Sequence, residues 1–150
     1  MISRCGLGIL ITLMVSGASR AQTSEEKQVL QVVEDFFGAL ERQDTAAFRK
    51  MFVKDANNYA VWDAGDSVVV RSQSSTAFRF NPKQILKERM RKESTSVKIE
   101  GRIAMVWAPY DLWINETFSH CGVDVFTLIK AHDGWKIASI SYTIEKVDCH

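Results

Sequence analysis

The sequence predicts an α+β domain in which helices from the N-terminal half pack on a strongly curved antiparallel sheet. Three observations predict this class. An amphipathic stretch begins at about residue 23, turn signals follow it, and the last third is rich in the β-branched and aromatic residues that favour strands. The 150 residues leave room for one domain, and 46% hydrophobic with 25% charged residues is an ordinary globular balance.

The first 21 residues have the order of a secretory signal peptide. Arg4 precedes an apolar run from Gly6 to Val15, and Ser19 and Ala21 occupy the small-residue positions of a cleavage site. A membrane anchor is the alternative, but a run of about ten apolar residues is too short to span a bilayer. We therefore expect cleavage near Ala21, a mature domain over residues 22–150, a secreted or periplasmic location, and no membrane attachment afterwards.

Charge excludes two classes of partner. Loss of the signal peptide removes Arg4 and Arg20, which leaves 17 basic and 18 acidic residues. This near balance does not favour nucleic acid or an anionic membrane surface. The basic side chains between residues 83 and 92 are interspersed with Glu88 and followed by Glu93, so we interpret them as a solvated helix face.

Three helices are expected. Thr23 and Glu26 have the spacing of a capping box, and apolar residues recur at helical spacing through residue 42. Asp44 can cap a second, short helix that buries Phe48 and its apolar neighbours. Asn81 followed by Pro82 predicts the start of a third helix that ends near residue 92. Its inward-facing residues would be Ile85, Leu86 and Met90.

The strands are predicted from composition and turns. Residues 58–63 and 67–72 flank a hairpin signal at residues 64–66, and residues 96–110, 118–131 and 135–147 read as three long strands. Asn115-Glu116 and Asp133-Gly134 are candidate two-residue turns between the long strands. A sheet of this kind wraps round the long helix and leaves an open mouth.

Two groups of residues resemble a known family. Residues 33–40, 43–44 and 48–52 resemble the opening of nuclear transport factor 2-like proteins. Residues 104–110, 120–128 and 133–137 are similar to the bacterial lumazine-binding-like and polyketide-cyclase-like branch. The resemblance implies a cone-shaped fold that hosts isomerases, dehydratases, hydrolases, cyclases and non-catalytic binders. It also implies a homodimer through the sheet face. No flavin or pteridine motif is present, so no cofactor is expected.

Strand pairing decides which side chains share a face. Two-residue turns at both predicted positions would set Asp111 opposite His120, Trp107 opposite Asp124, and Asp124 opposite Thr143. One face would then carry Trp107, Asp111, Trp113, His120, Asp124, Phe126, Ser139, Ser141 and Thr143. The drier face, which would pack on the helices, would carry Val106, Ala108, Tyr110, Val123, Val125, Ile140, Tyr142 and Ile144. A slip of one residue would exchange the set of one strand.

Three residues are catalytic candidates: His120, Asp124 and Asp111. A carboxylate beside an imidazole can orient it and raise its pKa, which suits a general acid or base. A structural hydrogen bond between His120 and Asp111 is the alternative. An Asp in the middle of an apolar strand can transfer protons with a raised pKa, or it can simply accept a hydrogen bond from Thr143 or a backbone amide.

Further residues are candidates for ligand contact. Aromatic side chains expected near the mouth of the cone, and an Arg between two Phe, could hold a ligand; an ordinary loop with apolar anchors is the alternative reading. These candidates are Tyr59, Trp62, Asp63, Arg79, Trp107, Tyr110 and Tyr142. A metal site is not expected, because His120, His132 and His150 lack ligand spacing.

Cys121 and Cys149 remain after signal cleavage. An oxidising compartment favours a disulfide between them. The predicted pairing opposes it, because Cys121 would face Lys146 and a straight strand would carry Cys149 about 10 Å away. A bend after Lys146 would allow the bridge, so both outcomes stay open.

The leading hypothesis is an exported protein that binds a small apolar molecule in an aromatic-lined pocket, with His120 and Asp124 as polar anchors. The alternatives are a small-molecule isomerase, dehydratase or hydrolase that uses Asp124 or His120 as its base, and a non-catalytic dimerisation module.

Overall fold

The structure, a computed structural model, describes residues 23–147 and residue 149. The predicted signal peptide lies outside the described residues. Within them, no helix is both long enough and apolar enough to cross a membrane.

The two N-terminal helices begin where the sequence predicts. Helix α1 (Ser24–Arg42) has the full capping box, with the Thr23 side chain accepting from the Glu26 amide and the Glu26 carboxylate accepting from the Thr23 amide. Helix α2 (Thr45–Lys50) is capped by Asp44, which accepts from the Ala47 amide at 3.0 Å. Both cap predictions are confirmed.

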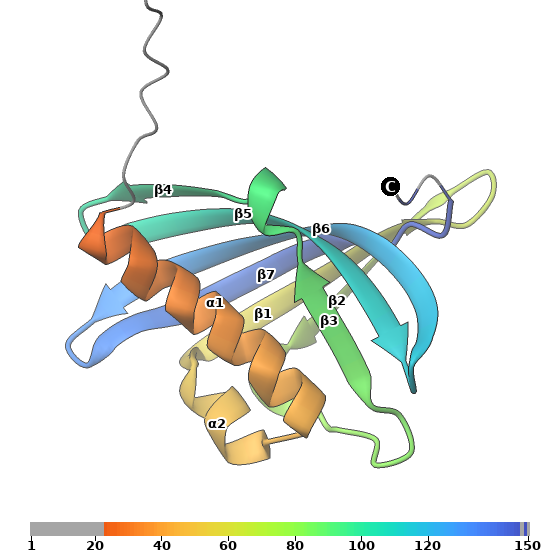
Figure 1. Cartoon of the computed structure of the whole chain (residues 1–150), viewed down its shortest axis with the longest axis horizontal. Coiled ribbons are helices and arrows are strands. Elements are labelled where there is room, and N and C mark those ends of the chain that lie inside the picture. The colour runs from red at the N-terminus through yellow and green to blue at the C-terminus, as the bar shows by residue number, and fades with distance from the viewer. Residues whose placement is uncertain (1–22, 148, 150) are drawn as a thin grey trace, which may run out of the picture.

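After α2 the described chain forms one strongly curved sheet, with two short 3-10 helices, η1 (Ser75–Ala77) and η2 (Lys92–Ser94), in its connections (Figure 1). The spatial order is β2-β1-β7-β6-β5-β3, and β4 also pairs with β5. All neighbours are antiparallel except β1 and β7. The strands are β1 (Phe52–Asp63), β2 (Val68–Ser74), β3 (Leu86–Met90), β4 (Ser96–Glu100), β5 (Ile103–Ile114), β6 (Thr117–Ala131) and β7 (Gly134–Thr143).

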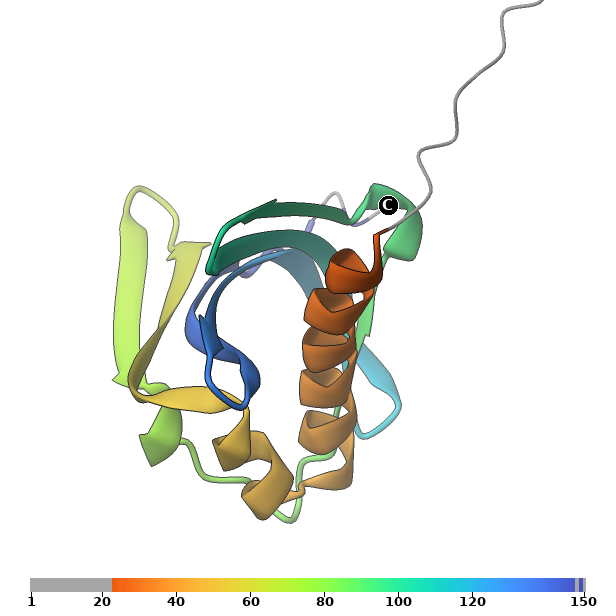
Figure 2. The ribbon, with the colours of Figure 1, turned by 90° about the vertical axis from the view of Figure 1, so that its left-hand side faces the viewer.

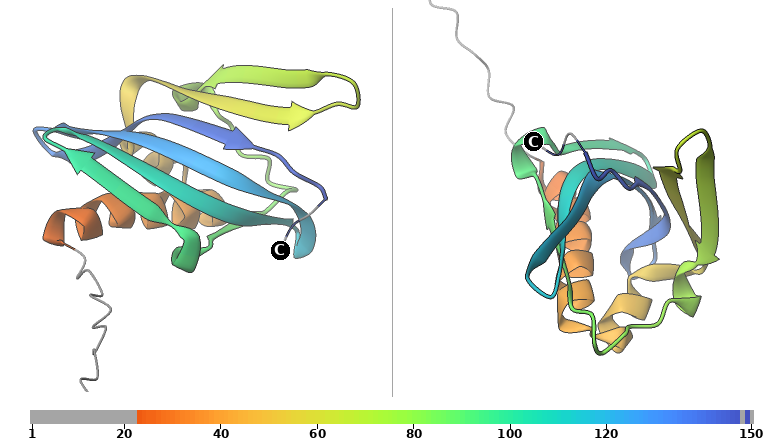
Figure 3. Two further views of the ribbon diagram at one scale, coloured as in Figure 1. Left: turned by 90° about the horizontal axis from the view of Figure 1, so that it is seen from above. Right: turned by 90° about the vertical axis from the view of Figure 1, so that its right-hand side faces the viewer.

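The sheet curls round one side of α1, and α1 lies against the concave face (Figure 2). None of the helices that the structure describes lies on the convex face, as the view from above shows (Figure 3). Burial of apolar area between α1 and the concave face stabilises this arrangement. The fully or nearly fully buried core side chains include Val29, Val33, Phe36, Phe37, Phe126, Leu128 and Ile137. The predicted α+β class, with helices on a curved and mainly antiparallel sheet, is confirmed.

The predicted third helix is wrong. Residues 86–90 form β3, which pairs with Tyr110–Ile114 of β5. Lys, Glu, Arg and Met are good helix formers, but intrinsic propensity is a weak determinant, and the ladder of hydrogen bonds along the edge of β5 overrides it. In β3 the side chain of Glu88 is buried while Arg89 next to it is exposed, which is the alternation of a strand.

The predicted strand over residues 96–110 is also wrong, because it is two strands. The chain turns at Gly101 with a φ of 56°, a value that suits glycine, and β4 folds back onto the first half of β5. Strands β4 and β3 thus lie one after the other along the same edge of β5.

The predicted pairing of β5 with β6 holds only next to its turn. Asn115 and Glu116 both have positive φ, as a two-residue hairpin turn requires, and Trp113 pairs with Phe118. Beyond that pair, Ser119 is an extra residue in β6, so Leu112 pairs with His120. This β-bulge shifts the rest of β6 by one residue and reverses its faces.

Three predicted partnerships are therefore wrong. Asp111 pairs with Cys121, Trp107 pairs with Val125, and Asp124 pairs with Ala108 on one side and with Tyr142 on the other. The turn between β6 and β7 is also displaced by one residue, since Ala131 pairs with Gly134.

Candidate functional site

A cavity of about 200 Å³ lies at one end of the concave face, beneath α1 and α2. Its lining is mostly aromatic and aliphatic, and its polar side chains come from β1, β2, β3, β5, β6 and β7. The lining residues are Phe36, Leu40, Phe48, Asn58, Gln73, Phe78, Leu86, Glu88, Tyr110, Leu112, His120, Asp124, Ile140, Tyr142 and Ile144.

Two carboxyl groups share this cavity. Glu88 of β3 is 9% exposed and Asp124 of β6 is 3% exposed, and their side chains lie within hydrogen-bonding reach of each other. Local structure brings both inward: strand alternation buries Glu88, and the Ser119 bulge turns Asp124 to the concave face. Neither carboxyl group forms an ion pair with any residue that the structure describes.

The pair holds protons more tightly than ordinary carboxyl groups. Burial raises the pKa of Glu88 from 4.5 to about 7, although its hydrogen bond with Asp124 partly opposes the rise. The pKa of Asp124 is raised well above its usual value, first by burial and then by the neighbouring Glu88 charge. Asp124 Oδ2 is buried and accepts no hydrogen bond from a fixed donor among the described residues. A proton held between the two groups satisfies this geometry, and such a pair can accept or donate a proton near neutral pH.

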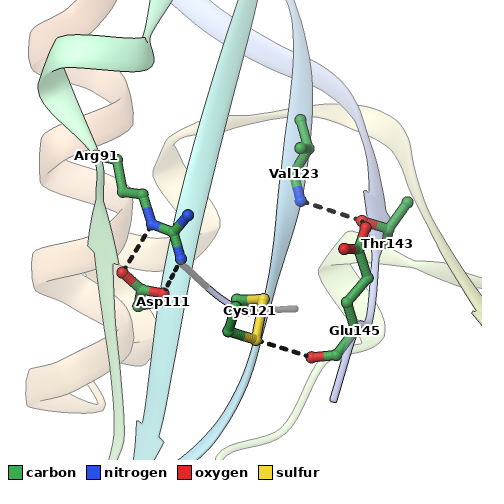
Figure 4. A network of polar contacts seen from close by, with 7 residues as sticks. Arg91, Asp111, Cys121, Val123, Thr143 and Glu145 are labelled. Atoms are coloured by element: carbon green, nitrogen blue, oxygen red, sulfur yellow. Dashed lines mark hydrogen bonds and ion pairs between the residues drawn. A yellow bond between two sulfur atoms is a disulfide. The ribbon is translucent and has the colours of Figure 1, made fainter. Parts of the chain in front are cut away.

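Tyr110 is the largest fully buried side chain and fixes one wall of the cavity. Its hydroxyl donates to the Thr143 carbonyl at 2.7 Å. To reach the Thr143 carbonyl, the Tyr110 ring passes over Gly122. A Cβ at position 122 would lie 2.2 Å from the Thr143 carbonyl oxygen and 2.9 Å from the Tyr110 ring. The Thr143 side chain is held in turn by the Val123 amide and Glu145 (Figure 4). Burial also raises the pKa of Tyr110, so its hydroxyl keeps its proton.

His120 is half-buried beside the carboxyl pair. Its ring meets the edge of Tyr110 at a centroid distance of 5.9 Å, and its Nδ1 lies 3.0 Å from the Ser119 hydroxyl. Burial lowers the pKa of His120, and the charge of Lys146 lowers it further. The imidazole is therefore neutral at physiological pH and can accept a proton or a hydrogen bond from a molecule in the cavity.

Comparison with known proteins places the chain in a family. The family model described as "Putative lumazine-binding" matches residues 24–143, which include every strand of the sheet. The chain belongs to this family. No curated protein matches the sequence.

Solved structures share the fold of this lumazine-binding-like domain. A nuclear transport factor 2-like protein with a cystatin-like fold from Novosphingobium aromaticivorans has a TM-score of 0.60 at 12% identity, covering 84% of each chain. The beta subunit of a "putative aromatic-ring-hydroxylating dioxygenase" from the same organism has a TM-score of 0.62 at 10% identity, covering 83% of this chain and 91% of the other. A "putative dehydratase" of the nuclear transport factor 2-like family from Streptomyces avermitilis has a TM-score of 0.58 at 15% identity, covering 79% and 94%.

Four of the sequence-predicted site residues lie together in this cavity of the lumazine-binding-like domain: Tyr110, His120, Asp124 and Tyr142. They come from β5, β6 and β7. The bulge at Ser119 explains why Asp124 joins Tyr110 and Tyr142, which the sequence places on the opposite face.

The other predicted ligand contacts do not line this cavity. Trp107 is 45% exposed on the convex face, and Tyr59 is also exposed. The Arg71 guanidinium lies over the Trp62 ring, with Cζ 5.4 Å from the ring centroid. Trp62 and Asp63 instead border a second, more polar pocket of about 570 Å³, together with residues 143–147. The Arg79 guanidinium donates to the carbonyl oxygens of Thr76 and Phe78, which are within its own loop.

The predicted pairing of Asp111 with His120 is wrong. Asp111 faces away from the cavity and forms a two-point ion pair with Arg91, one hydrogen bond of which measures 2.9 Å (Figure 4). This pair joins the end of β3 to β5.

The structure contains a disulfide between Cys121 and Cys149, with Cα atoms 5.7 Å apart. Cys121 forms an isolated bridge with Glu145, one residue short of the predicted partner Lys146. The backbone bends at residues 146 and 147, and the disulfide joins Cys149 to Cys121 of β6. The bend that would permit the bridge is thus present.

Glu88 is the site residue that the sequence analysis missed. It was read as part of a solvated helix face among basic residues. The usable signal is the alternation of Leu86, Glu88 and Met90, which is typical of a strand with one buried face. In the part of the chain that the structure describes, no group of three or more His, Cys, Asp or Glu side chains could hold a metal ion.

Proposed function

We propose that this domain binds a small, mostly apolar molecule in the cavity between α1 and the concave face. One observation carries the proposal: two buried carboxyl groups without a cationic partner face an aromatic-lined cavity. Leaving a buried polar group unsatisfied costs about 1–3 kcal/mol. Neither carboxyl group has a cation that would offset its burial, so their presence in the cavity lining supports a role toward a bound molecule.

The dimensions of the cavity limit the ligand. Ligand sites typically enclose about 300–1,000 Å³, whereas this cavity measures about 200 Å³. An apolar cavity of about 150 Å³ holds a benzene ring. The proposed ligand is therefore a molecule of one ring, or an aliphatic chain of similar volume, that meets the carboxyl pair with a polar group.

Ligand-observed NMR with a panel of one-ring compounds tests the proposal. At least one compound should bind the wild-type protein, and Leu86→Trp, which fills the cavity from β3, should abolish the signal. Trp107→Ser is the matched control, because it removes an aromatic side chain from the convex face and should leave binding unchanged.

The wild-type protein and the variants Leu86→Trp and Trp107→Ser can also refute the proposal. If no compound binds, the cavity is not a ligand site. If Trp107→Ser removes binding while Leu86→Trp preserves it, the ligand sits on the convex face, as the sequence-based pairing would require. Circular dichroism must first show that both variants fold.

A second candidate function is general acid–base catalysis of the isomerase or dehydratase type. The observation that favours it is the carboxyl pair, because the pKa of Glu88 near 7 lets it take up and return a proton at neutral pH. Tyr142 and His120 lie on the same cavity and could donate to or accept from a substrate oxygen.

Exchange of substrate hydrogen for deuterium tests this candidate without knowledge of the product. One-ring ketones incubated with the protein in deuterium oxide should lose the NMR signal of the hydrogen next to the carbonyl. Glu88→Gln and Asp124→Asn should each stop the exchange, and the exposed Asp63→Asn should not. Binding without exchange in the wild type would leave the binding function and exclude this one.

We also propose that the domain acts outside the cytoplasm after cleavage near Ala21. The Cys121–Cys149 disulfide supports this, because such bonds persist in oxidising compartments. Mass spectrometry of the protein purified from the periplasm or medium should give a chain that begins at residue 22. A chain that begins at Met1 in those fractions would contradict it.

A further inference from the structure

The charges around the cavity are unbalanced. The lining contains Glu88 and Asp124 but no Lys or Arg, and its one His has a lowered pKa. Elsewhere in the described chain, several partly buried acidic side chains pair with cations, as Asp111 does with Arg91 and Glu25 with Lys130. The cavity is therefore a buried acidic site without a counter-ion.

We propose that the molecule bound here is a small organic cation, a protonated amine on a one-ring or short aliphatic body, whose ammonium group lies against Glu88 and Asp124. The inference rests on the proposed function, which needs only a ligand and leaves its charge undefined. It identifies the chemical class that supplies the missing positive charge.

The residues that line the cavity favour a positively charged ligand over a negatively charged or neutral one. An ammonium group supplies up to three donors to carboxylate oxygens, including the unpartnered Asp124 Oδ2. The aromatic walls, among them Phe36, Tyr110 and Tyr142, are compatible with a cation because ring faces attract positive charge. A carboxylate ligand would instead face two acids with no Lys or Arg to hold it, and a neutral ligand would bring no positive charge to favour the ionised form of the pair.

Binding of a cation should also release protons. Burial raises the pKa of both carboxyl groups, so the pair is only partly ionised near neutral pH; an ammonium group beside it favours the ionised form, and the protons lost in that shift pass to the solvent. The other ionisable groups that face the pair are Tyr110 on β5, His120 on β6 and Tyr142 on β7, while α1 contributes only Phe36 and Leu40. Both tyrosines keep their protons and His120 is neutral, so the carboxyl pair is the source of the released proton.

Three isosteric probes test the inference on the disulfide-intact protein: benzylamine, benzyl alcohol and benzoate. Isothermal titration calorimetry should show benzylamine binding at least tenfold more tightly than benzyl alcohol at pH 7, with no binding of benzoate. The affinity for benzylamine should rise about tenfold between pH 5 and pH 7. Titrations in two buffers of different ionisation enthalpy should show release of up to one proton per molecule bound.

Isosteric variants test whether the preference for benzylamine over benzyl alcohol depends on the carboxyl pair. Glu88→Gln and Asp124→Asn should each weaken benzylamine at least tenfold, leave benzyl alcohol within threefold of wild type, and flatten the pH dependence. Asp63→Asn, which removes an exposed carboxyl group that is not in the cavity, should change none of these. Benzyl alcohol binding also shows that each variant is folded.

The outcomes separate this inference from the proposed function. Benzyl alcohol binding as well as or better than benzylamine, with both excluded by Leu86→Trp, would retain a small-molecule site and overturn the cation. Tight benzoate binding would overturn it as well. Absence of binding by all three probes would overturn the inference, and absence of binding by the wider compound panel would overturn the proposed function.

Discussion

Glu88 and Asp124 stand on opposite sides of β5 and still bring their carboxyl groups together. Glu88 pairs with Leu112 along one edge of β5, and Asp124 pairs with Ala108 along the other. The sheet is strongly curved (Figure 2), and both side chains line the cavity on its concave side. The proximity of the two acids is therefore a product of the fold, and it has consequences for stability as well as for ligand binding.

The first prediction concerns pH. The native pKa of Glu88, about 7, lies above its ordinary value of 4.5, so between these values the native state holds a proton that the unfolded state has released. Stability should therefore fall as pH rises through this window, by up to about 3 kcal/mol for this group, and level off above it. The raised pKa of Asp124 acts in the same direction. Urea unfolding at a series of pH values measures the fall.

Glu88→Gln supplies the control for that series. The variant cannot ionise at this position, so it should lose most of the decrease and exceed wild type in stability at pH 8. His120, whose lowered pKa gives a slope of opposite sign, is present in both proteins and cancels in the comparison. Parallel curves for the two proteins would show that Glu88 is an ordinary exposed acid.

The second prediction concerns Gly122. In Gly122→Ala the new methyl group would meet the Thr143 carbonyl and the Tyr110 ring, so the hydrogen bond between them must lengthen or break. Overpacking of this kind costs about 1–3 kcal/mol of unfolding free energy. Ser141→Ala, at an exposed position of β7, should stay within about 0.5 kcal/mol of wild type. Equal stability of the two variants would mean that the ring does not lie over Gly122.

The local parts of this fold could be predicted because their causes are local. The capping box at Thr23, the Asp44 cap and the positive-φ turn at Asn115 depend on residues within a few positions of each other. The family resemblance extended that prediction to the overall fold, which the family match over residues 24–143 supports.

The interior of the site could not be predicted because it depends on one inserted residue. The Ser119 bulge buries Phe126 and Leu128 on the concave face, and the same shift carries Asp124 inward with them. The sequence between the turn and Asp124 has no clear bulge signature, so a register without the bulge is equally compatible with it. Burial of two large apolar side chains decides the register, and only the packed structure shows it.

Glu88 was hidden for a different reason. The stretch from Pro82 to Lys92 has the start signal and the composition of a helix. Its strand conformation comes from the unpaired edge of β5, a partner distant in sequence that no local pattern reveals. The sequence therefore predicts Asp124 on the wrong face of β6, and it predicts Glu88 in a helix although this residue lies in strand β3.

The third prediction concerns the disulfide. Cys121 and Cys149 are 28 residues apart, and a loop of that length stabilises the native state by about 3 kcal/mol through the entropy of the unfolded chain. Cys149→Ser should lower the free energy of unfolding by about that amount. A reducing agent should lower the melting temperature of wild type and leave that of the variant unchanged. A melting temperature of wild type that does not respond to full reduction, verified by thiol titration, would contradict it.

The fourth prediction concerns the homodimer that the family resemblance implies. The convex face carries exposed apolar side chains, among them Trp107 and Ile129, and no helix within residues 23–147 covers it (Figure 3). Contact between two such faces would bury these side chains, and a charge placed there would oppose association because it would have to be desolvated.

Size-exclusion chromatography with light scattering should give twice the monomer mass for wild type and the monomer mass for Trp107→Glu. Tyr59→Glu is the matched control, since Tyr59 is exposed on β1, away from β5 and β6, and should leave the dimer intact. A monomeric wild type at all concentrations tested would show that the convex face faces solvent.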